Sequence, residues 1–460
     1  MRYTLLLLAL CALNANAASI AVIDSGTDWK HPALSLNYLM NEAETPSNKI
    51  DDDKNGYIDD THGWNFAEQN NQVIDYSYLG KFSPEINKFF EVQTRMLEGV
   101  ATESEKEWLK SKRDDQEFLK QLQVFGNFAH GTHVSGIAAK DQHQNYLFAV
   151  KLIPTEVKLP FARMFTESRI FSSPVPMASG FKDMLFASGL GLLAKQQSKL
   201  LGTIGAYVNL RKADVANGSF GTGSKQARMI VETLYKAVFK KEEQNEEHLM
   251  GFVKHFMTSL IMESKAFVDA APKTLFVFAA GNDGTNNDEM PTSPANIRAD
   301  NSITVAATLH NRSLAVFSNF GEKMVDIAAP GVGIVSAIPG TEMMTMSGTS
   351  QASPYVANVA AVVKTLNPSL KPSEIKMILM ATVDKKAWLK GKVASGGFVN
   401  PQRAAVAAEL SVSNDIYVAV AKARESVKDL EIATSPQFFR GNSDLSLQDV
   451  LVAPLPSPIY

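Results

Sequence analysis

The sequence predicts an α/β fold in which a mainly parallel central sheet is flanked by helices on both faces. Short apolar runs alternate along the chain with longer helical or loop segments, and this pattern is typical of parallel strands joined by helical crossovers. The runs lie at residues 20–23, 150–153, 215–219, 275–279 and 303–306. Because the carboxyl ends of parallel strands meet at one edge of a sheet, we expect the functional side chains at that edge.

Length and composition agree with one large domain that contains a substantial core. The chain has 460 residues, of which 45% are hydrophobic, and its formal net charge is -3. This charge balance provides no basic face for a nucleic acid. Cys11 is the single cysteine, so no disulfide can form within the chain. We therefore expect a monomer that is stabilised by packing, with bound ions as a further source of stability.

The N-terminus has the pattern of a secretory signal peptide over residues 1–17. Met1 and Arg2 precede a leucine-rich run, and Ala-Asn-Ala at residues 15–17 forms a cleavage site. We expect a secreted or periplasmic protein without stable membrane insertion, because the apolar run is too short to span a bilayer. A lipid anchor on Cys11 is the alternative, although Leu10 is larger than the residue that such processing prefers.

Ser350 is the most informative residue of the chain. It lies in Ser-Gly-Thr-Ser-Gln-Ala-Ser-Pro at residues 347–354, which leads into the apolar stretch 355–363, so a helix is expected to begin at or just after it. Free N–H groups and the positive end of the helix dipole favour a negative charge that develops beside such a hydroxyl. Ser350 is therefore either a nucleophile or an ordinary helix cap.

A serine nucleophile requires a base that takes its proton and a carboxylate that orients the base. The apolar run at residues 20–23 ends in Asp24, which we expect at the carboxyl end of a buried strand. His130 precedes Gly-Thr-His-Val-Ser-Gly at residues 131–136, and we expect it at the start of a helix of small residues. The chain order is then Asp, His, Ser.

These segments resemble the subtilisin-like serine peptidases, in which the triad has the same chain order. Residues 24–32, 130–136 and 347–354 are similar to the aspartate, histidine and serine motifs of that family. Phe-Val-Phe-Ala-Ala-Gly-Asn at residues 276–282 and Val-Ala-Asn-Gly-Ser-Phe-Gly at residues 215–221 are further matches. The resemblance covers about residues 19–408 and implies a subtilisin-like three-layer fold with a mainly parallel sheet.

The resemblance also implies roles for the matching residues. Ser350 is the expected nucleophile, His130 the general base, and Asp24 the carboxylate that orients the imidazole. The side-chain amide of Asn282 and the N–H of Ser350 are expected to bind the oxyanion, and a donor of this kind contributes about 10²–10³ in turnover. Position 351, usually methionine in the family, is Gln351 here.

The resemblance also implies that the substrate lies as an added strand along Ser219, Phe220 and Gly221. His31 and His133 are interpreted as packed or hydrogen-bonded histidines without a catalytic role.

The domain prediction has a signal peptide at 1–17, a peptidase domain at 18–410 and a C-terminal extension at 411–460. Helical insertions are expected near residues 84–125, where a capping box begins at Thr102, and as a hairpin near 225–271. They are interpreted as surface additions, with a lid or partner site as the alternative. The extension contains one expected helix near residues 415–430 and then a proline-rich segment at 454–458 that is loosely ordered or wraps on the domain.

Relatives in the family usually have a propeptide between the signal peptide and the first strand, and only Ala18 and Ser19 lie there in this sequence. The alternatives are folding without such a segment, its replacement by another part of the chain, or a start of the protein further upstream.

An acidic turn near residue 51 is a candidate calcium site. Asp51, Asp53, Asn55 and Asp59 provide oxygen ligands around Gly56, in a pattern like the first half of an EF-hand loop. No bidentate glutamate closes that loop, so an EF-hand is excluded. Structural calcium and a plain hydrogen-bonded turn both remain possible interpretations, and the chemistry itself is expected to need no cofactor.

The sequence therefore predicts a secreted serine endopeptidase that acts on proteins or peptides through an Asp-His-Ser triad and an acyl-enzyme. A catalytically silent binding protein on the same scaffold is the alternative. A third possibility is a calcium-dependent surface or structural protein in which the triad has no function.

Overall fold

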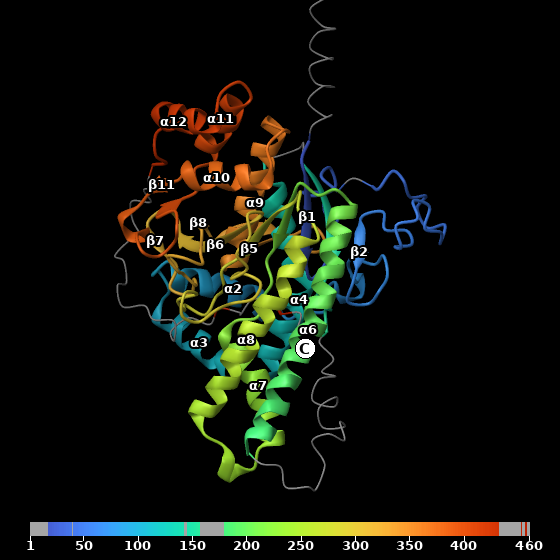
Figure 1. Ribbon diagram of the computed structural model, residues 1–460, viewed down its shortest axis with the longest axis vertical. Helices are drawn as coiled ribbons and strands as arrows, with labels where there is room; N and C mark the ends of the chain where they lie inside the picture. Colours follow the sequence, from blue (N-terminus) through green and yellow to red (C-terminus); the bar gives the residue numbers. More distant parts are fainter. Residues whose placement is uncertain are drawn as a thin grey trace, which may run out of the picture.

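The computed structural model describes residues 17–38, 40–141, 145–156, 179–431, 452 and 456–457. Its centre is a ten-stranded sheet with the order β11-β12-β8-β6-β5-β4-β1-β3-β2, and β7 pairs with β6 beside this path (Figure 1). The strands are β1 (Ser19–Asp24), β2 (Gly63–Asn65), β3 (Tyr146–Lys151), β4 (Val215–Gly218), β5 (Leu275–Ala279), β6 (Ser302–Leu309), β7 (Ser313–Leu314), β8 (Ile327–Pro330), β11 (Asp384–Lys385) and β12 (Gly397–Phe398). A separate antiparallel pair joins β9 (Ile334–Ala337) and β10 (Met343–Met346).

Parallel pairing dominates the sheet, as the sequence predicts. Only the β6–β7 and β11–β12 pairs in it are antiparallel. Each of the expected apolar runs forms or overlaps a strand, although the run at 150–153 covers only the end of β3. The α/β prediction is confirmed.

Helices cover both faces of the sheet. They are α2 (Pro84–Leu97), α3 (Glu103–Arg113), α4 (Gln116–Ala139), α6 (Ser179–Leu210), α7 (Ser224–Val238), α8 (Glu246–Asp269), α9 (Thr349–Leu366), α10 (Pro372–Ala381), α11 (Pro401–Ser411) and α12 (Ile416–Ser426), with short 3₁₀ turns at Tyr76–Tyr78, Lys241–Glu243 and Ala387–Leu389.

Alternate side chains of the central strands enter two separate apolar clusters, because successive residues of a strand point to opposite faces. Ile20 and Val22 of β1 pack with residues of α4, α9 and α11, whereas Ala21 and Ile23 pack with residues of α6 and α8. These strand residues are at most 1% exposed. Burial on both faces explains why β1 is a continuous apolar run and not an alternating one.

The first insertion differs from the prediction in one respect. Helices α2 and α3 form as expected, and the capping box at Thr102 is present with Glu105 as its partner. However, α4 begins at Gln116, where Asp115 caps it, and continues without a break to Ala139. His130 therefore lies inside a long helix, and the prediction that it starts a helix is wrong. Gly126 is the only helix-breaking residue between positions 116 and 130, and a single glycine costs about 1 kcal/mol, too little to end a packed helix.

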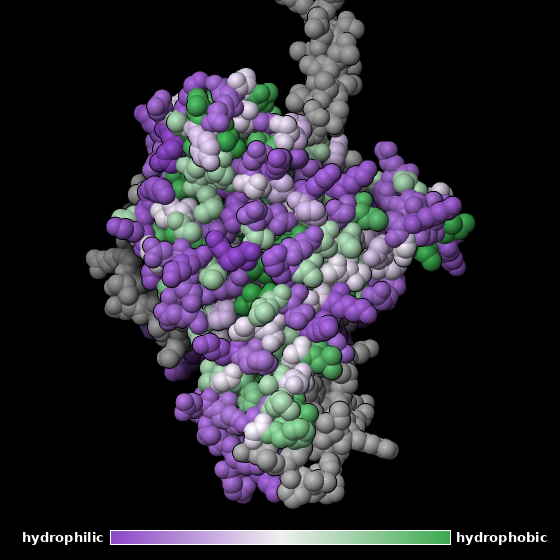
Figure 2. Space-filling view, viewed as in Figure 1, coloured by the Kyte–Doolittle hydropathy of each residue, from purple (hydrophilic) through white to green (hydrophobic). Residues whose placement is uncertain are grey.

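The second insertion is the predicted helical hairpin, formed by α7 and α8. Helix α6, which packs against α8, was not predicted from the sequence. The three helices extend from one end of the sheet as a bundle with its own apolar cluster (Figure 1). Figure 2 shows hydrophobic groups among mainly hydrophilic ones on this projection. Exposed hydrophobic side chains on these helices include Met184, Leu192, Met229 and Met262.

The start of the C-terminal extension is an integral part of the domain. The expected helix near 415–430 is α12, and it packs against α11. The buried guanidinium of Arg403 contacts Asp384 and Asp429, each at 2.8 Å, and also donates to the carbonyl oxygen of Val427. The Arg403–Asp384 pair is buried, whereas the Asp429 side chain is 54% exposed, so the extension joins this network through Asp429 and the carbonyl oxygen of Val427.

Among the described residues, no helix is both long and apolar enough to cross a membrane. The predicted signal peptide, apart from Ala17, and most of the proline-rich segment lie outside the described residues.

Candidate active site

Asp24 is the last residue of β1 and is completely buried. Its Oδ1 atom accepts a hydrogen bond from the N–H of Ser25 at 2.7 Å, which fixes the orientation of the carboxylate. The chain then turns at Gly26, whose φ of +106° is rarely adopted by residues with a side chain. A Cβ atom at this position would also lie 2.1 Å from the carbonyl oxygen of Val73, so only glycine permits this turn.

His130 approaches Asp24 from α4. The Nδ1 atom of His130 lies 2.7 Å from Oδ1 of Asp24, and because a carboxylate only accepts, Nδ1 carries the proton. The Nε2 atom is then the basic nitrogen. This approach requires Gly131, since a Cβ atom there would lie 2.1 Å from the carbonyl oxygen of Gly26. The imidazole side chain is 13% exposed, which leaves it accessible to a substrate.

Ser350 is the second residue of α9, so the helix begins one residue earlier than predicted. Its Oγ donates to the carbonyl oxygen of Ser219 at 3.4 Å, and the Oγ of Ser219 donates to the carbonyl oxygen of Ser350 at 3.0 Å. The described residues include no hydrogen bond between Ser350 and His130. Catalytic hydrogen bonds are often long before substrate binds, and a rotation about χ1 redirects this hydroxyl.

The contact that brings the serine helix to the histidine helix was not predicted from the sequence. His133 lies nearly one turn after His130 on α4, and its Nδ1 contacts the side-chain amide of Gln351 at 3.4 Å. Its Nε2 donates to the carbonyl oxygen of Met344 at 3.0 Å, so Nδ1 accepts from Gln351. Each partner is therefore close in sequence to a catalytic candidate. The interpretation of His133 as a packed, hydrogen-bonded residue is confirmed.

Burial lowers the pKa of His133 to about 3, because a charged imidazole would lose its hydration at this buried position. His31 is likewise buried and hydrogen-bonded, with Nε2 at 3.1 Å from the carbonyl oxygen of Glu342. Neither histidine contacts Asp24 through a hydrogen bond among the described residues.

Asn282 follows β5 and contacts the start of α9. Its Oδ1 accepts from the N–H of Thr349 at 2.9 Å and from the Thr349 hydroxyl at 2.8 Å. Gly348, the residue before this helix, has no side chain for capping, so Asn282 satisfies one of the free N–H groups. These bonds assign Oδ1 to the helix and direct the NH₂ group away from Thr349. A Cβ atom on Gly348 would lie 3.4 Å from that Nδ2 atom.

Ser219, Phe220 and Gly221 continue from β4 beside Ser350. Phe220 is buried. The side-chain amide of Asn217 donates to the hydroxyl of Ser219 at 2.9 Å, and its oxygen accepts from the hydroxyl of Ser353 in α9 at 2.7 Å. The backbone of Thr222 pairs with that of Ser293 in both directions. Polar contacts at both ends therefore hold this segment in place next to Ser350.

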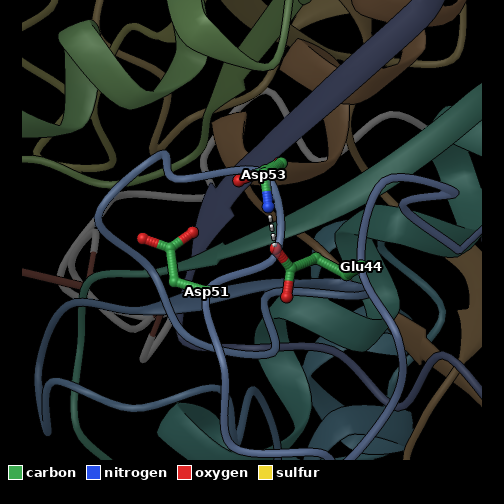
Figure 3. Close-up of side chains that lie close together, drawn as sticks. All are labelled: Glu44, Asp51 and Asp53. Carbon is green, nitrogen blue, oxygen red and sulfur yellow. Dashed lines mark hydrogen bonds between the residues drawn. The ribbon is translucent and has the colours of Figure 1, made fainter.

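Two of the four predicted calcium ligands, Asp51 and Asp53, lie close to Glu44, which was not predicted. Carboxylate oxygens of Asp51, Asp53 and Glu44 all lie within 4.8 Å of one another. Figure 3 shows them around one loop, with the N–H of Asp53 donating to Glu44. Oxygen ligands at 2.3–2.6 Å from one Ca²⁺ are at most roughly 5 Å apart, so this group fits the ion in spacing and in chemistry.

Asn55 and Asp59 have other contacts. The side-chain oxygen of Asn55 accepts from the N–H of Tyr57 at 2.7 Å, and its NH₂ donates to Asp53 at 3.0 Å. The carboxylate of Asp59 accepts the N–H groups of Asn48 and Lys49. Glu44 could not be found from the turn pattern, because it lies outside the turn and is brought there by a fold of the loop.

Comparisons with known proteins find similar sequences over most of the chain. The model of the Subtilase family matches residues 15–402. Subtilisin-like protease 1 of Plasmodium vivax is 26% identical over 401 residues, which cover 85% of this chain and 48% of that protein. Alkaline elastase YaB of Bacillus sp. (strain YaB) is 40% identical over 124 residues, 27% of this chain and 31% of that protein. The chain thus spans about half or less of the length of these relatives.

Among solved structures, a cold adapted subtilisin-like serine proteinase is similar with a TM-score of 0.38 and 20% identity, over 83% of this chain and 86% of that one.

The neutral buried His133 makes the fold sensitive to acid. The unfolded chain binds a proton at this residue below the ordinary pKa of 6.5, whereas the folded chain does so only near 3. The contribution of His133 to the free energy of unfolding therefore has its full value above pH 6.5. It decreases as the pH falls from 6.5 to about 3, by at most about 1.4 kcal/mol per pH unit. We expect His133→Gln to reduce the slope of unfolding free energy against pH by that amount between about pH 6 and about pH 5.

Urea unfolding of both proteins across this range measures the slopes, and their difference removes contributions from all other titrating groups. Equal slopes would contradict a neutral His133 in the folded state.

Proposed function

The chain belongs to the subtilase family, and on this premise we propose that it is a serine endopeptidase that cleaves proteins through an acyl-enzyme. The contact between Asp24 and the protonated Nδ1 of His130 is the observation that carries the proposal. It gives the imidazole a fixed orientation and a basic Nε2 atom, the two properties that a general base for Ser350 requires.

In the proposed mechanism, Oγ of Ser350 attacks the carbonyl carbon of the scissile peptide and Nε2 of His130 accepts the hydroxyl proton. The imidazolium then protonates the leaving amine, and the acyl group remains on Ser350. Water attacks this ester as Nε2 accepts one of its protons, and the imidazolium then returns that proton to Oγ of Ser350 as the ester bond breaks and the acid product leaves. Asp24 stays ionised throughout and stabilises the imidazolium through the contact at Nδ1.

The tetrahedral oxyanion is proposed to bind at the N-terminus of α9. Asn282 contributes its NH₂ group, because its oxygen is engaged by Thr349. The N–H of Ser350 and the positive end of the helix dipole contribute on the other side. These donors are held by a helix and a strand end, so they require little reorganisation during the reaction.

We also propose that Glu44, Asp51 and Asp53 hold a structural calcium ion. Their oxygens supply hard ligands in a group of suitable size, and each carboxylate retains lone pairs beside its hydrogen bonds. A bound ion would offset the repulsion among these like charges and fix the loop that precedes β2. It supplies no chemistry to the peptidase reaction.

Export is proposed from residues 1–17, whose charged start, apolar run and small-residue end form a secretory signal. The proposed mature chain begins at Ala18 and acts on protein or peptide substrates outside the cytoplasm.

The triad proposal predicts that a fluorophosphonate labels Ser350 in the full chain and that Ser350→Ala abolishes both labelling and peptide hydrolysis. Asn282→Ala is expected to lower kcat by about 10²–10³ while Ser350 remains labelled, because the variant retains the nucleophile but loses one oxyanion donor. Active-site titration and steady-state kinetics measure the two effects, and the melting temperature checks that each variant is folded. A folded, unlabelled parent protein would favour the catalytically silent alternative.

The calcium proposal predicts that Ca²⁺ raises the melting temperature, since an ion that binds only the folded state at a hundredfold excess over Kd stabilises it by about 2.7 kcal/mol. Asp51→Asn and Glu44→Gln are expected to lose this response. Asp59→Asn is the matched control, because its carboxylate accepts N–H groups outside the cluster. An equal calcium response in all variants would exclude the site.

The export proposal predicts a secreted chain that begins Ala18-Ser19, which N-terminal sequencing detects. A mature chain that begins at Cys11 and carries a lipid mass would instead support the lipoprotein alternative.

A further inference from the structure

The backbone donor at the end of the proposed substrate edge is occupied by the C-terminal part of the same chain. The N–H of Gly221 donates to the carbonyl oxygen of Pro456 at 2.8 Å. Beside it, the hydroxyls of Thr222 and Ser457 are 2.8 Å apart, although 235 positions separate these residues in the sequence. Val452 packs against the same apolar cluster that contains residues of α9. The described part of the tail thus contacts the domain at two places.

The backbone N–H of Gly221 points away from Ser293, the residue that pairs with the adjacent Thr222. The backbone N–H and C=O of Thr222 are both bonded to Ser293. Successive N–H groups of an extended chain point to opposite sides, so the N–H of Gly221 is directed to the free side of the edge. A peptide that adds to this edge as a strand must pair with the same group.

This position is close to the nucleophile. Two residues before Gly221, the carbonyl oxygen of Ser219 accepts the hydroxyl of Ser350. Two residues of an extended strand span about 7 Å, so the Pro456 contact lies within a few residues of the site where the scissile bond would be held. One amide N–H makes one strong hydrogen bond, and occupation by the tail therefore excludes a substrate strand from this position.

Proline at position 456 also suits a segment that occupies the edge but can be displaced. Its carbonyl oxygen accepts the hydrogen bond from Gly221, but proline has no N–H that could donate back to the edge, so the tail forms only part of the strand pairing here. Prolines at positions 454, 456 and 458 favour an extended backbone, which reduces the entropy lost on docking. A peptide without proline at this position can make the additional bond and compete.

We propose that the segment around Pro456 and Ser457 is an intramolecular inhibitor that binds to the substrate edge at Gly221 and Thr222. The inference rests on the proposed peptidase function, since it assigns the regulation of the same site. A tethered segment acts at an effective concentration on the order of 1 mM, so even a weak contact keeps the edge occupied. Substrates compete with it, and the expected kinetic signature is a raised KM with an unchanged kcat.

A disulfide between positions 222 and 457 tests the proposal in the full chain. The hydroxyl contact brings these side chains to a separation that suits a disulfide, and Cys11 is the only native cysteine. We would combine Thr222→Cys with Ser457→Cys in a Cys11→Ala background and measure hydrolysis of a tetrapeptide substrate in oxidised and reduced samples. Each single-cysteine variant in the same background is the matched control.

Oxidation is expected to lower kcat/KM for the tetrapeptide by at least about tenfold, and dithiothreitol is expected to restore it, with no such change in the controls. Deletion of residues 452–460 should lower KM, and a peptide of that sequence added in trans should inhibit the shortened enzyme competitively. Equal activity of the oxidised and reduced forms, or failure of the disulfide to form, would overturn the proposal.

Fluorophosphonate labelling of the reduced double variant separates this inference from the function on which it rests. Labelling together with hydrolysis that does not respond to oxidation refutes the inhibitory tail and leaves the peptidase proposal intact. Absence of labelling in both the reduced variant and the parent protein refutes the peptidase proposal and the inference with it.

Discussion

The candidate site depends on one contact, the 2.7 Å hydrogen bond between Asp24 at the end of β1 and His130 inside α4. This approach of the strand end to the middle of the helix requires Gly131 on α4, because a Cβ atom there would lie 2.1 Å from the carbonyl oxygen of Gly26. A Cβ atom on Gly26 would instead collide with the carbonyl oxygen of Val73, so Gly26 permits the turn that follows Asp24. The burial of Asp24 then strengthens the electrostatic coupling, since little water screens the pair.

A second group of buried polar contacts positions Ser350 relative to this pair. The His133–Gln351 hydrogen bond joins α4 to α9, and Asn282 joins the end of β5 to the first turn of α9. Gly348 leaves the start of that helix without a side-chain cap of its own. Asn282 therefore caps the helix and is also the residue whose NH₂ group is proposed to bind the oxyanion, so the stability of the helix start and the orientation of this amide depend on the same side chain.

Features encoded by adjacent residues could be predicted from the sequence. The strand at β1, the start of α9 near Ser350 and the capping box at Thr102 each depend on local periodicity or on a single turn. The continuation of α4 through His130 was missed because the pattern of small residues suggested a new start, whereas packing decided the length of the helix. Glu44 and the Gln351–His133 contact were missed because they join residues that only the complete fold brings together.

The substrate edge illustrates a general conflict in enzymes that bind extended peptides. Such an edge must present unpaired N–H and C=O groups, and these same groups attract any extended segment within reach. The backbone pairing of Thr222 with Ser293 occupies one side of this segment, whereas the proposed binding of substrate requires the N–H of Gly221 on the other side. A covering segment that accepts this hydrogen bond and returns none satisfies both requirements, because it shields the edge from other strands and still yields to a peptide with a complete set of donors.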